Sequence, residues 1–421
     1  MVDKFYKVFK VKELRNKIII VGLFLVAFRI LAAIPMPGVD VLRLKEFFAS
    51  NQLFSFLGIM AGSTLSNLSI VMLGVGPYIT ATIIMQLLTM IFPRIKEMYY
   101  EDGNIGRAKF NRISRYLTIP LAGLQGYGFL NLLMSQGVLP ALGLFAIIKS
   151  VIVITAGSVI LMWLGELITE QKIGNGISLI IFAGIVSGIP SALNNIIKSY
   201  NPSDLVIYVS FIIVSILVIA GVVYINEGER KIPVSYAKQV RGNKMYGGVA
   251  TYLPLKVNQA GVIPIIFAIS VLLFPQFLAQ VSAVISKSFS LKFIEFVNQF
   301  MNNQYYYAIA YFFLVFIFTY FYTAVTFDPS EISKNLQHSG GFITGIRPGE
   351  STTIFLSKII SRITFWGAIF LGIIAILPNI LRIITDISFL TIGGTAVLIV
   401  VSVALETLRQ INSQMIVREY E

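Results

Sequence analysis

FLGIMAGSTLSNLSI, residues 56–70, lies within a run of 47 residues, 47–93, that contains no charged side chain. At the helical rise per residue, one straight helix of that length would be roughly 70 Å long, more than twice the hydrocarbon thickness of a membrane. Its Gly, Ser, Thr and Asn residues also set the quoted stretch apart from the more apolar residues that follow. The run therefore cannot be a single membrane span.

The composition is that of a polytopic helical membrane protein. Hydrophobic residues make up 56% of the chain and charged residues 13%, and apolar runs of 17 or more residues recur along its length. The chain has no cysteine, which excludes disulfides and thiolate metal sites. About ten spans are predicted, centred on residues 18–34, 70–92, 116–134, 151–168, 177–197, 205–225, 258–282, 305–327, 363–379 and 388–406.

The distribution of Lys and Arg gives the orientation of these spans. If the N-terminus is cytoplasmic, 25 of the 33 basic residues fall in inner segments and seven in outer segments, with Arg29 inside the first span. Basic residues concentrate on the cytoplasmic side of membrane proteins, so both termini are predicted to be cytoplasmic. The basic N-terminus also resembles a signal peptide, but the apolar stretch runs on into IPMPGVD without a small-residue cleavage site.

The same orientation divides the uncharged run. The segment before it is expected outside, whereas the basic segment after it, RIKEMYYEDGNIGRAKFNR, is expected inside. An odd number of crossings must join them, so residues 71–92 are predicted to form one full span and the quoted stretch a half-helix that enters from outside. Backbone that does not span is tolerated at membrane depth only when protein buries it or a wet cavity borders it. A central cavity is therefore expected, unless the half-helix lies on the outer membrane surface.

A Gly/Pro motif repeats in the two halves of the chain. GVGP, residues 74–77, interrupts the second span, and GVIP, residues 261–264, interrupts the seventh. In a chain read as five spans plus five, these two correspond and run in opposite directions. Paired interruptions of this kind indicate an inverted repeat with the working site between the halves. Because Gly and Pro are common in membrane helices, a chance echo stays open.

The spans lack the groups that membrane enzymes and coupled transporters use. Glu166, Asp328 and Glu406 lie near cytoplasmic ends, and the only histidine, His338, lies in the polar segment between spans eight and nine. An intramembrane enzyme, a metal site and a cofactor are therefore not expected. No phosphate-binding G-x-x-x-x-G-K-[ST] loop is present either. A secondary transporter for a small solute remains the alternative, although it would place coupling groups at mid-membrane.

Two polar segments are expected on the cytoplasmic side. Residues 227–256 contain IPVSYAKQV and KMYGGVATYL around RGN, which predicts a β-hairpin. Residues 328–362 are rich in Gly and Pro and present Arg347 in a turn-like GIRPG. Basic loops can simply set topology or contact anionic membrane lipids. Two substantial loops on one face also suit a cytosolic partner, either acidic protein or RNA phosphate.

Long motifs in these segments resemble the SecY/Sec61-alpha family of protein-conducting channels. They include SIVMLGVGPYITATIIMQLL, GSVILMWLGELITEQKIGNGISLIIFAGIVSGIP, ERKIPVSYAKQVRGNKMYGG, TYLPLKVNQAGVIPIIFA and SGGFITGIRPGEST. The likeness covers essentially the whole chain, and the compact cytoplasmic loops look bacterial. Such motifs in this order and spacing are specific to the family.

The resemblance implies an all-α fold of ten transmembrane helices, arranged as two inverted five-helix halves around an hourglass pore. The halves would be residues 1–190 and 204–421, with a hinge loop at 191–203. A re-entrant plug helix, at about residues 53–67, would close the outer funnel; its central residues are Leu57, Gly58, Ile59, Met60, Ala61, Gly62, Ser63, Thr64 and Leu65. The pore ring would consist of Val75, Ile79, Ile177, Ile181, Ile266 and Ile399.

The resemblance also implies a second exit and several partners. A lateral gate between spans two and three and spans seven and eight would carry Thr80, Gln86 and Asn258, and would release transmembrane segments into the lipid. Basic residues expected to dock the SecA motor or the ribosome are Arg230, Lys231, Lys238, Arg241, Lys244 and Arg347. The small subunits SecE and SecG, signal peptides and nascent polypeptides would be further partners. The location would be the plasma (inner) membrane.

Overall fold

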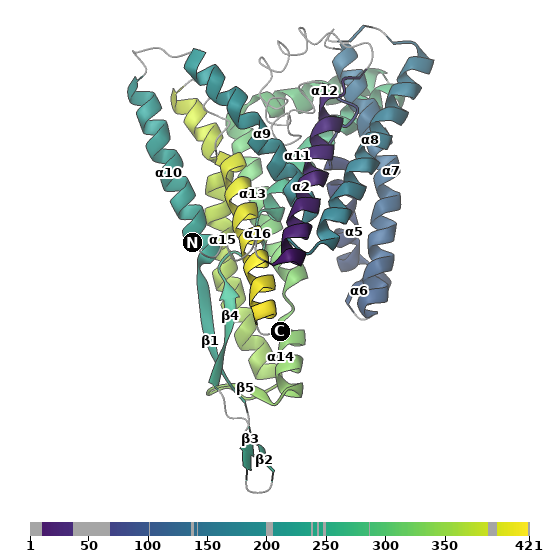
Figure 1. Cartoon of the computed structure of the whole chain (residues 1–421). Helices are drawn as coiled ribbons and strands as arrows, with labels where there is room; N and C mark the ends of the chain where they lie inside the picture. The colour runs from purple at the N-terminus through teal and green to yellow at the C-terminus, as the bar shows by residue number, and fades with distance from the viewer. Residues whose placement is uncertain are drawn as a thin grey trace.

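The computed structural model describes residues 11–36, 68–100, 102–135, 139–140, 142–198, 205–236, 239–241, 244–246, 250–285, 287–385 and 394–419. The predicted plug, including residues 57–65, lies outside these ranges, and so does Lys238. The described chain is mainly helical, with a small β-structured extension at one end (Figure 1).

The helices account for all ten predicted spans. Within the described residues, seven helices are long and apolar enough to cross a membrane, two more form a pair bent by 114°, and two others carry shorter apolar stretches. The spans correspond to α2 (Lys12–Ala33), α5 (Gly76–Ile91), α7 (Gly103–Ser135), α8 (Leu144–Glu170), α9 (Gly176–Lys198), α10 (Leu205–Glu227), α11 (Ile263–Ile285), α13 (Gln304–Thr326), α15 (Glu350–Thr385) and α16 (Gly394–Glu419). Shorter helices are α6 (Pro93–Tyr100), α12 (Lys287–Asn302) and α14 (Pro329–His338).

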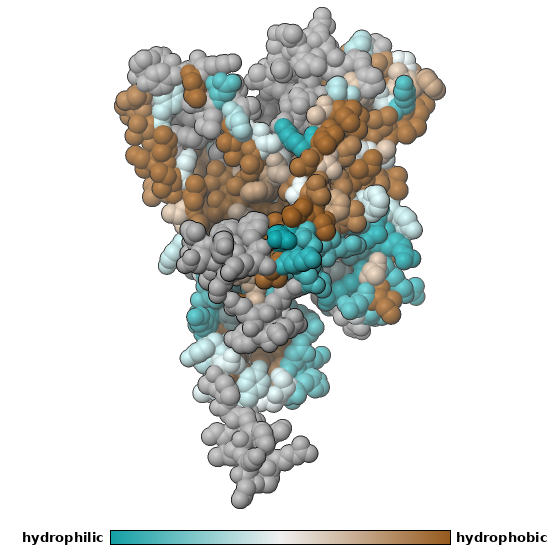
Figure 2. Space-filling model, in the orientation of Figure 1, coloured by the Kyte–Doolittle hydropathy of each residue, from teal (hydrophilic) through white to brown (hydrophobic). Residues whose placement is uncertain are grey.

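Surface hydropathy follows this arrangement. Figure 2 shows a broad apolar band across the visible face of the helical bundle and hydrophilic residues below it, over α6, α14 and the sheet. Exposed apolar side chains such as Ile152, Trp163 and Ile216 lie on α8 and α10. Apolar side chains on the outside of a bundle are stable against lipid and costly against water, so the chain is a multi-pass membrane protein.

Two of the predicted boundaries are wrong. The second span was expected from residue 71, but residues 71–75 form turns and α5 begins only at Gly76, because Gly74 has a positive φ of +58° that an α-helix cannot continue. The predicted hinge loop, 191–203, begins inside α9, which continues to Lys198. Pro190 lies inside that helix, because a proline removes one helical hydrogen bond and can kink a helix without ending it.

The predicted hairpin is confirmed, and its strand β1 is part of a three-stranded sheet. β1 (Glu229–Tyr236) pairs antiparallel with β4 (Ala250–Lys256), and at its tip β2 (Gln239–Arg241) pairs with β3 (Lys244–Tyr246). β5 (Gly341–Ile343) comes from the other predicted loop and pairs with the opposite edge of β1. Ile232, Val234, Leu255 and Ile343 pack with Leu356 of α15 in one buried cluster. The two loops therefore form a single unit on the end of α15.

The largest buried cluster lies in the middle of the bundle, where the first and second halves of the chain meet. It includes apolar residues from α2, α5, α8 and α9 and from α10, α11, α13, α15 and α16. α11 contacts both α5 and α7, so the two halves are closed against each other along this seam. In Figure 1, α5, α7 and α8 lie on one side of the bundle, and α10, α15 and α16 lie on the other.

Candidate functional site

The six predicted ring residues all contribute to the central apolar core. Five of them, Val75, Ile79, Ile181, Ile266 and Ile399, are between 1% and 8% exposed and belong to its buried cluster, and Ile177 packs against that cluster. They come from the start of α5 and from α9, α11 and α16. We call these six residues the collar.

Two glycines with positive φ begin the helices that carry part of the collar. Gly74 has φ +58° before α5, and Gly261 has φ +62° before α11. Each is followed by Val, one further residue and Pro, and the helix begins at that further residue, Gly76 or Ile263. Pro suits the first helical turn because the backbone N–H that it lacks would have no partner within the helix at that position. The paired motifs are therefore corresponding helix starts rather than kinks within helices.

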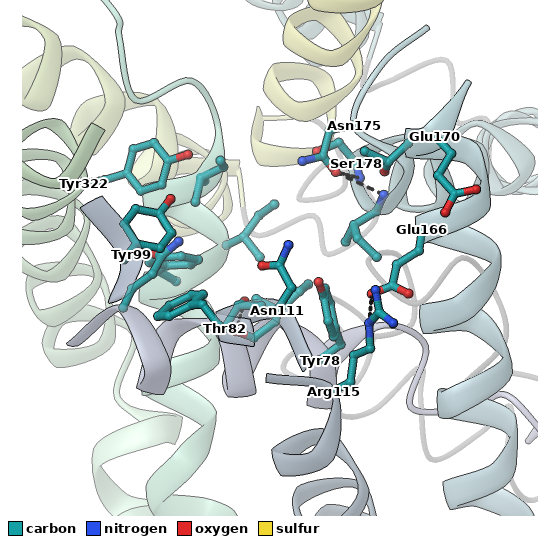
Figure 3. Close-up of a pocket in the computed structure, with 18 residues that line it drawn as sticks. Tyr78, Thr82, Tyr99, Asn111, Arg115, Glu166, Glu170, Asn175, Ser178 and Tyr322 are labelled. Carbon is teal, nitrogen blue, oxygen red and sulfur yellow. Dashed lines mark hydrogen bonds and ion pairs between the residues drawn. The ribbon is translucent and has the colours of Figure 1, made fainter. Parts of the chain in front are cut away.

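A polar cavity of about 430 Å³ opens on one side of the collar. Ile79, Ile177 and Ile266 form part of its wall, while Tyr78, Thr82, Asn111 and Asn175 give it a polar character; Gln86, Tyr99, Glu166, Glu170, Ser178 and Tyr322 also line it. Figure 3 shows Tyr99 and Tyr322 on the opposite side of the cavity from Glu166 and Glu170. A polar space therefore ends against aliphatic side chains.

An ion pair ties two helices together at the rim of this cavity. Arg115 Nε of α7 donates to Glu166 Oε1 of α8 at 2.6 Å (Figure 3). Both residues are partly solvent-accessible, so the pair contributes about 1 kcal/mol or less. Among the residues that the structure describes, no group of three or more His, Cys, Asp or Glu side chains could hold a metal ion.

Two of the three predicted gate residues, Thr80 and Asn258, belong to separate hydrogen-bonded groups. Thr80 of α5 accepts a hydrogen bond from Gln125 Nε2 of α7 at 3.3 Å. Asn258, just before α11, instead donates to Asn226 Oδ1 of α10 at 2.8 Å, and Asn226 Nδ2 donates to Ser402 Oγ of α16 at 2.7 Å. Gln86 lines the polar cavity.

Sequence reasoning missed three members of these groups: Gln125, Asn226 and Ser402. Each is a polar residue within or at the end of an apolar span, and that was the available signal. Which polar side chains meet across the bundle depends on helix packing, which the spans do not specify.

Apart from Lys238, which lies outside the described residues, the predicted docking residues lie on the unit formed by the two polar segments, 227–256 and 328–362. Arg230 and Lys231 are exposed on β1, and Arg347 is exposed in the turn between β5 and α15. Arg241 and Lys244 are partners in the backbone register of the β2–β3 pair at the tip. Thr352 Oγ1 donates to the Arg347 carbonyl at 2.9 Å, which anchors that turn to the first residues of α15.

Solved structures similar to this chain are protein-conducting channels. The structure of a protein conducting channel matches with a TM-score of 0.65 and 23% identity, over 94% of this chain and 91% of that one. A SecY structure concerned with the plug domain and Sec61 in the canine ribosome–channel complex each match with a TM-score of 0.63 and 22% identity, over the same shares. These matches define the class of fold, which is that of a polytopic helical channel.

Sequence comparisons define the family. The family model SecY matches residues 69–408. Protein translocase subunit SecY of Mycobacterium tuberculosis is 41% identical over 442 residues, covering 100% of this chain and 99% of its own length. SecY of Thermus thermophilus is 40% identical over 444 residues, covering 100% and 97%. The chain therefore belongs to the SecY family.

Proposed function

We propose that this chain is the pore of a protein translocase, which passes unfolded polypeptides across the plasma membrane and releases transmembrane segments sideways into the lipid. The observation that carries the proposal is the aliphatic collar at the end of a polar cavity, in a chain of the SecY family. The chain would be a passive conduit rather than an enzyme. Energy would come from a bound SecA ATPase or from the translating ribosome.

The chemistry of the collar suits this task. A pore that passes any polypeptide cannot hold a fixed polar filter, whereas a ring of aliphatic side chains can exclude water when empty and yield around a passing chain. All six collar side chains are Val or Ile, without a polar atom. The plug, which one related SecY structure describes as maintaining a membrane seal, would close the outer side.

The seam between α5, α7 and α11 is our candidate for the lateral gate. Its described hydrogen bond, Gln125 to Thr80, joins two helices of the same half and does not cross to α11. Opening the seam would therefore leave that bond intact. α11 contacts the first half of the chain mainly through apolar packing. Lipid or an incoming transmembrane segment can replace such packing.

The unit formed by the two polar segments, 227–256 and 328–362, is our candidate for partner docking, and we expect it on the cytoplasmic side. Arg230, Lys231 and Arg347 present positive charge on it, and Arg241 and Lys244 lie at its tip. One matching structure is a Sec61 channel in complex with a ribosome, which supports a docking role for this face. SecE and SecG would pack beside the bundle, and both termini would be cytoplasmic.

Disulfide crosslinking tests the proposed path, because the chain has no native cysteine. Ile181→Cys places a thiol in the collar, and Ile213→Cys places the control on α10, where the side chain is 53% exposed on the apolar surface. A secretory polypeptide with one cysteine is trapped in mid-transit. We expect crosslinks from position 181 that depend on SecA or the ribosome, and none from 213. Confirmed trapping without a crosslink at 181 would place the path elsewhere.

A further inference from the structure

One helix outside the membrane spans, α12, leaves part of its apolar side uncovered. It links α11 to α13 and lies across the end of the bundle opposite the sheet (Figure 1). Its sequence, KSFSLKFIEFVNQFMN, places apolar and polar side chains on different sides of a helix, so α12 is amphipathic. It is not among the helices that are long and apolar enough to cross a membrane.

The middle of the apolar side is fixed to the rest of the protein. Val297 and Met301, four residues apart on α12, are 4% and 7% exposed. They form a small buried cluster, against which Phe293, Phe300 and Tyr307 pack. Phe300 and Tyr307 also pack against the large central cluster of the bundle. Contacts with α13 and the bundle therefore fix which side of α12 faces inward.

The edge of the apolar side is open. Phe293, Phe296 and Phe300 are three and four residues apart, so they follow one line along the helix. Phe293 and Phe300 are half-buried, whereas Phe296 is 66% exposed. Lys292 is exposed too, and it lies four residues before Phe296, which makes the two side chains neighbours on the helix surface. A cation therefore borders an exposed aromatic ring.

The start of α13 places α12 at the edge of the membrane. Asn303 caps α13, and its side chain accepts hydrogen bonds from the backbone N–H groups of Tyr305 and Tyr306. These two tyrosines are 64% and 59% exposed, and Ile309, one turn further along, is 56% exposed. Exposed tyrosines are typical of the membrane–water boundary, and exposed aliphatic residues beyond them contact lipid. Because α12 ends at Asn302, its last turn lies at this boundary.

A membrane surface provides what both exposed groups need. An amphipathic helix in the membrane surface inserts its apolar side chains about 5–10 Å deep and keeps its cations among the headgroups. We propose that α12 is such a surface anchor: Phe296 enters the acyl-chain region of the adjoining leaflet, and Lys292 binds the phosphate of an anionic phospholipid. Phe296 then continues the apolar surface that α13 presents to lipid. This inference goes beyond the proposed function and does not depend on it.

Tryptophan fluorescence of the full chain in vesicles tests the anchor. The two native tryptophans, Trp163 and Trp366, are exposed on α8 and α15, and both are first replaced by Phe. Phe296→Trp then places a single reporter at the proposed point of insertion. Gln299→Trp is the matched control, because Gln299 is exposed on the polar side of the same helix. The vesicles contain phosphatidylcholine and phosphatidylglycerol, one of which is brominated on the upper part of its acyl chains.

The two reporters should respond in opposite ways to two quenchers. Quenching by brominated lipid should be at least about twice as strong for Phe296→Trp as for Gln299→Trp, because an inserted side chain reaches the acyl region. Aqueous iodide should quench Gln299→Trp more strongly. If iodide quenches both equally and brominated lipid quenches neither, this side of α12 faces water and the anchor is wrong. Parent-like melting temperatures in detergent would show that both variants are folded.

Moving the bromine between the two lipids tests Lys292. In Phe296→Trp, brominated phosphatidylglycerol should quench about two- to fivefold more than the same fraction of brominated phosphatidylcholine, because one Lys near the surface attracts anionic lipid. Lys292→Gln should remove this difference. Lys334→Gln, which changes an exposed Lys of α14 near the sheet, should preserve it. Equal quenching by the two lipids with Lys292 present would show that this side chain binds no anionic headgroup.

Discussion

Replacing Gly165 by Ala should disturb the collar while leaving the fold nearly as stable. Gly165 lies on α8 against the start of α9, and an added Cβ would be 2.5 Å from Cδ1 of the collar residue Ile177. Ordinary carbon–carbon contacts are about 3.5–4.0 Å, so Ile177 has to move by about 1 Å. The obstructing atom is the end of a flexible side chain, which can change its rotamer.

The expected cost follows from this geometry. An off-rotamer side chain costs about 1 kcal/mol, and Ala in place of Gly within a helix regains up to about 1 kcal/mol. The net change in the free energy of unfolding should therefore be close to zero. Gly176→Ala is the contrasting variant, because its Cβ would overlap the backbone of Gly165, 2.7 Å from the carbonyl carbon. Since neither backbone can rotate away, we expect a loss of about 3 kcal/mol or more.

Two measurements separate these effects. In detergent, the free energies of unfolding of Gly165→Ala and of the control Gly22→Ala should be close to that of the parent chain, and that of Gly176→Ala should be well below them. Gly22→Ala serves as the control because a Cβ at Gly22 meets nothing within 4 Å. Ion leak through reconstituted vesicles should rise for Gly165→Ala and stay at the parent level for Gly22→Ala. A Gly165→Ala protein that is stable and does not leak would refute the placement of Ile177 in the seal. An equally stable Gly176→Ala protein would refute the close α8–α9 packing.

Three further predictions concern other parts of the molecule. Gly74→Ala and Gly261→Ala each force Ala into a positive φ, so the free energy of unfolding should fall by about 1–2 kcal/mol in either variant, as measured by detergent unfolding. Asn226→Ala leaves Asn258 Nδ2 and the Ser402 hydroxyl short of a partner and should cost about 2 kcal/mol in the same assay; no loss would mean that water replaces the amide. Arg347→Glu should leave stability within about 0.5 kcal/mol but weaken SecA or ribosome binding in a salt-dependent titration, and unchanged binding would remove Arg347 from the docking face.

Local patterns were enough to predict the membrane spans and the hairpin. An apolar run long enough to cross a membrane has few alternatives to a helix, since unpaired backbone groups are too costly in lipid. The two runs around RGN likewise predicted the hairpin, whose first strand, β1, includes the start of IPVSYAKQV. The sequence also located both Gly/Pro motifs, although it could not tell a kink from a helix start. That distinction depends on φ at Gly74 and Gly261, which became visible only in the folded chain.

The collar could not be derived from spacing alone. Ile177 and Ile181 recur at a helical interval like any pair of core residues, and only the family resemblance singled them out. The hydrogen-bond partners of the polar side chains could not be predicted for a related reason. Nothing local brings Asn226 to Asn258, or either of them to Ser402, which is 176 residues from Asn226.

By itself, the sequence determined that this is a polytopic helical membrane protein, with the orientation of its spans predicted from its basic residues and two Gly/Pro motifs located in the second and seventh spans. These properties depend on local hydropathy, charge and backbone freedom. Only the tertiary structure decided that β5 joins the hairpin, that Asn258 binds α10, and that a polar cavity borders the collar. Those features arise from packing between segments far apart in the chain, and no local pattern encodes which faces meet.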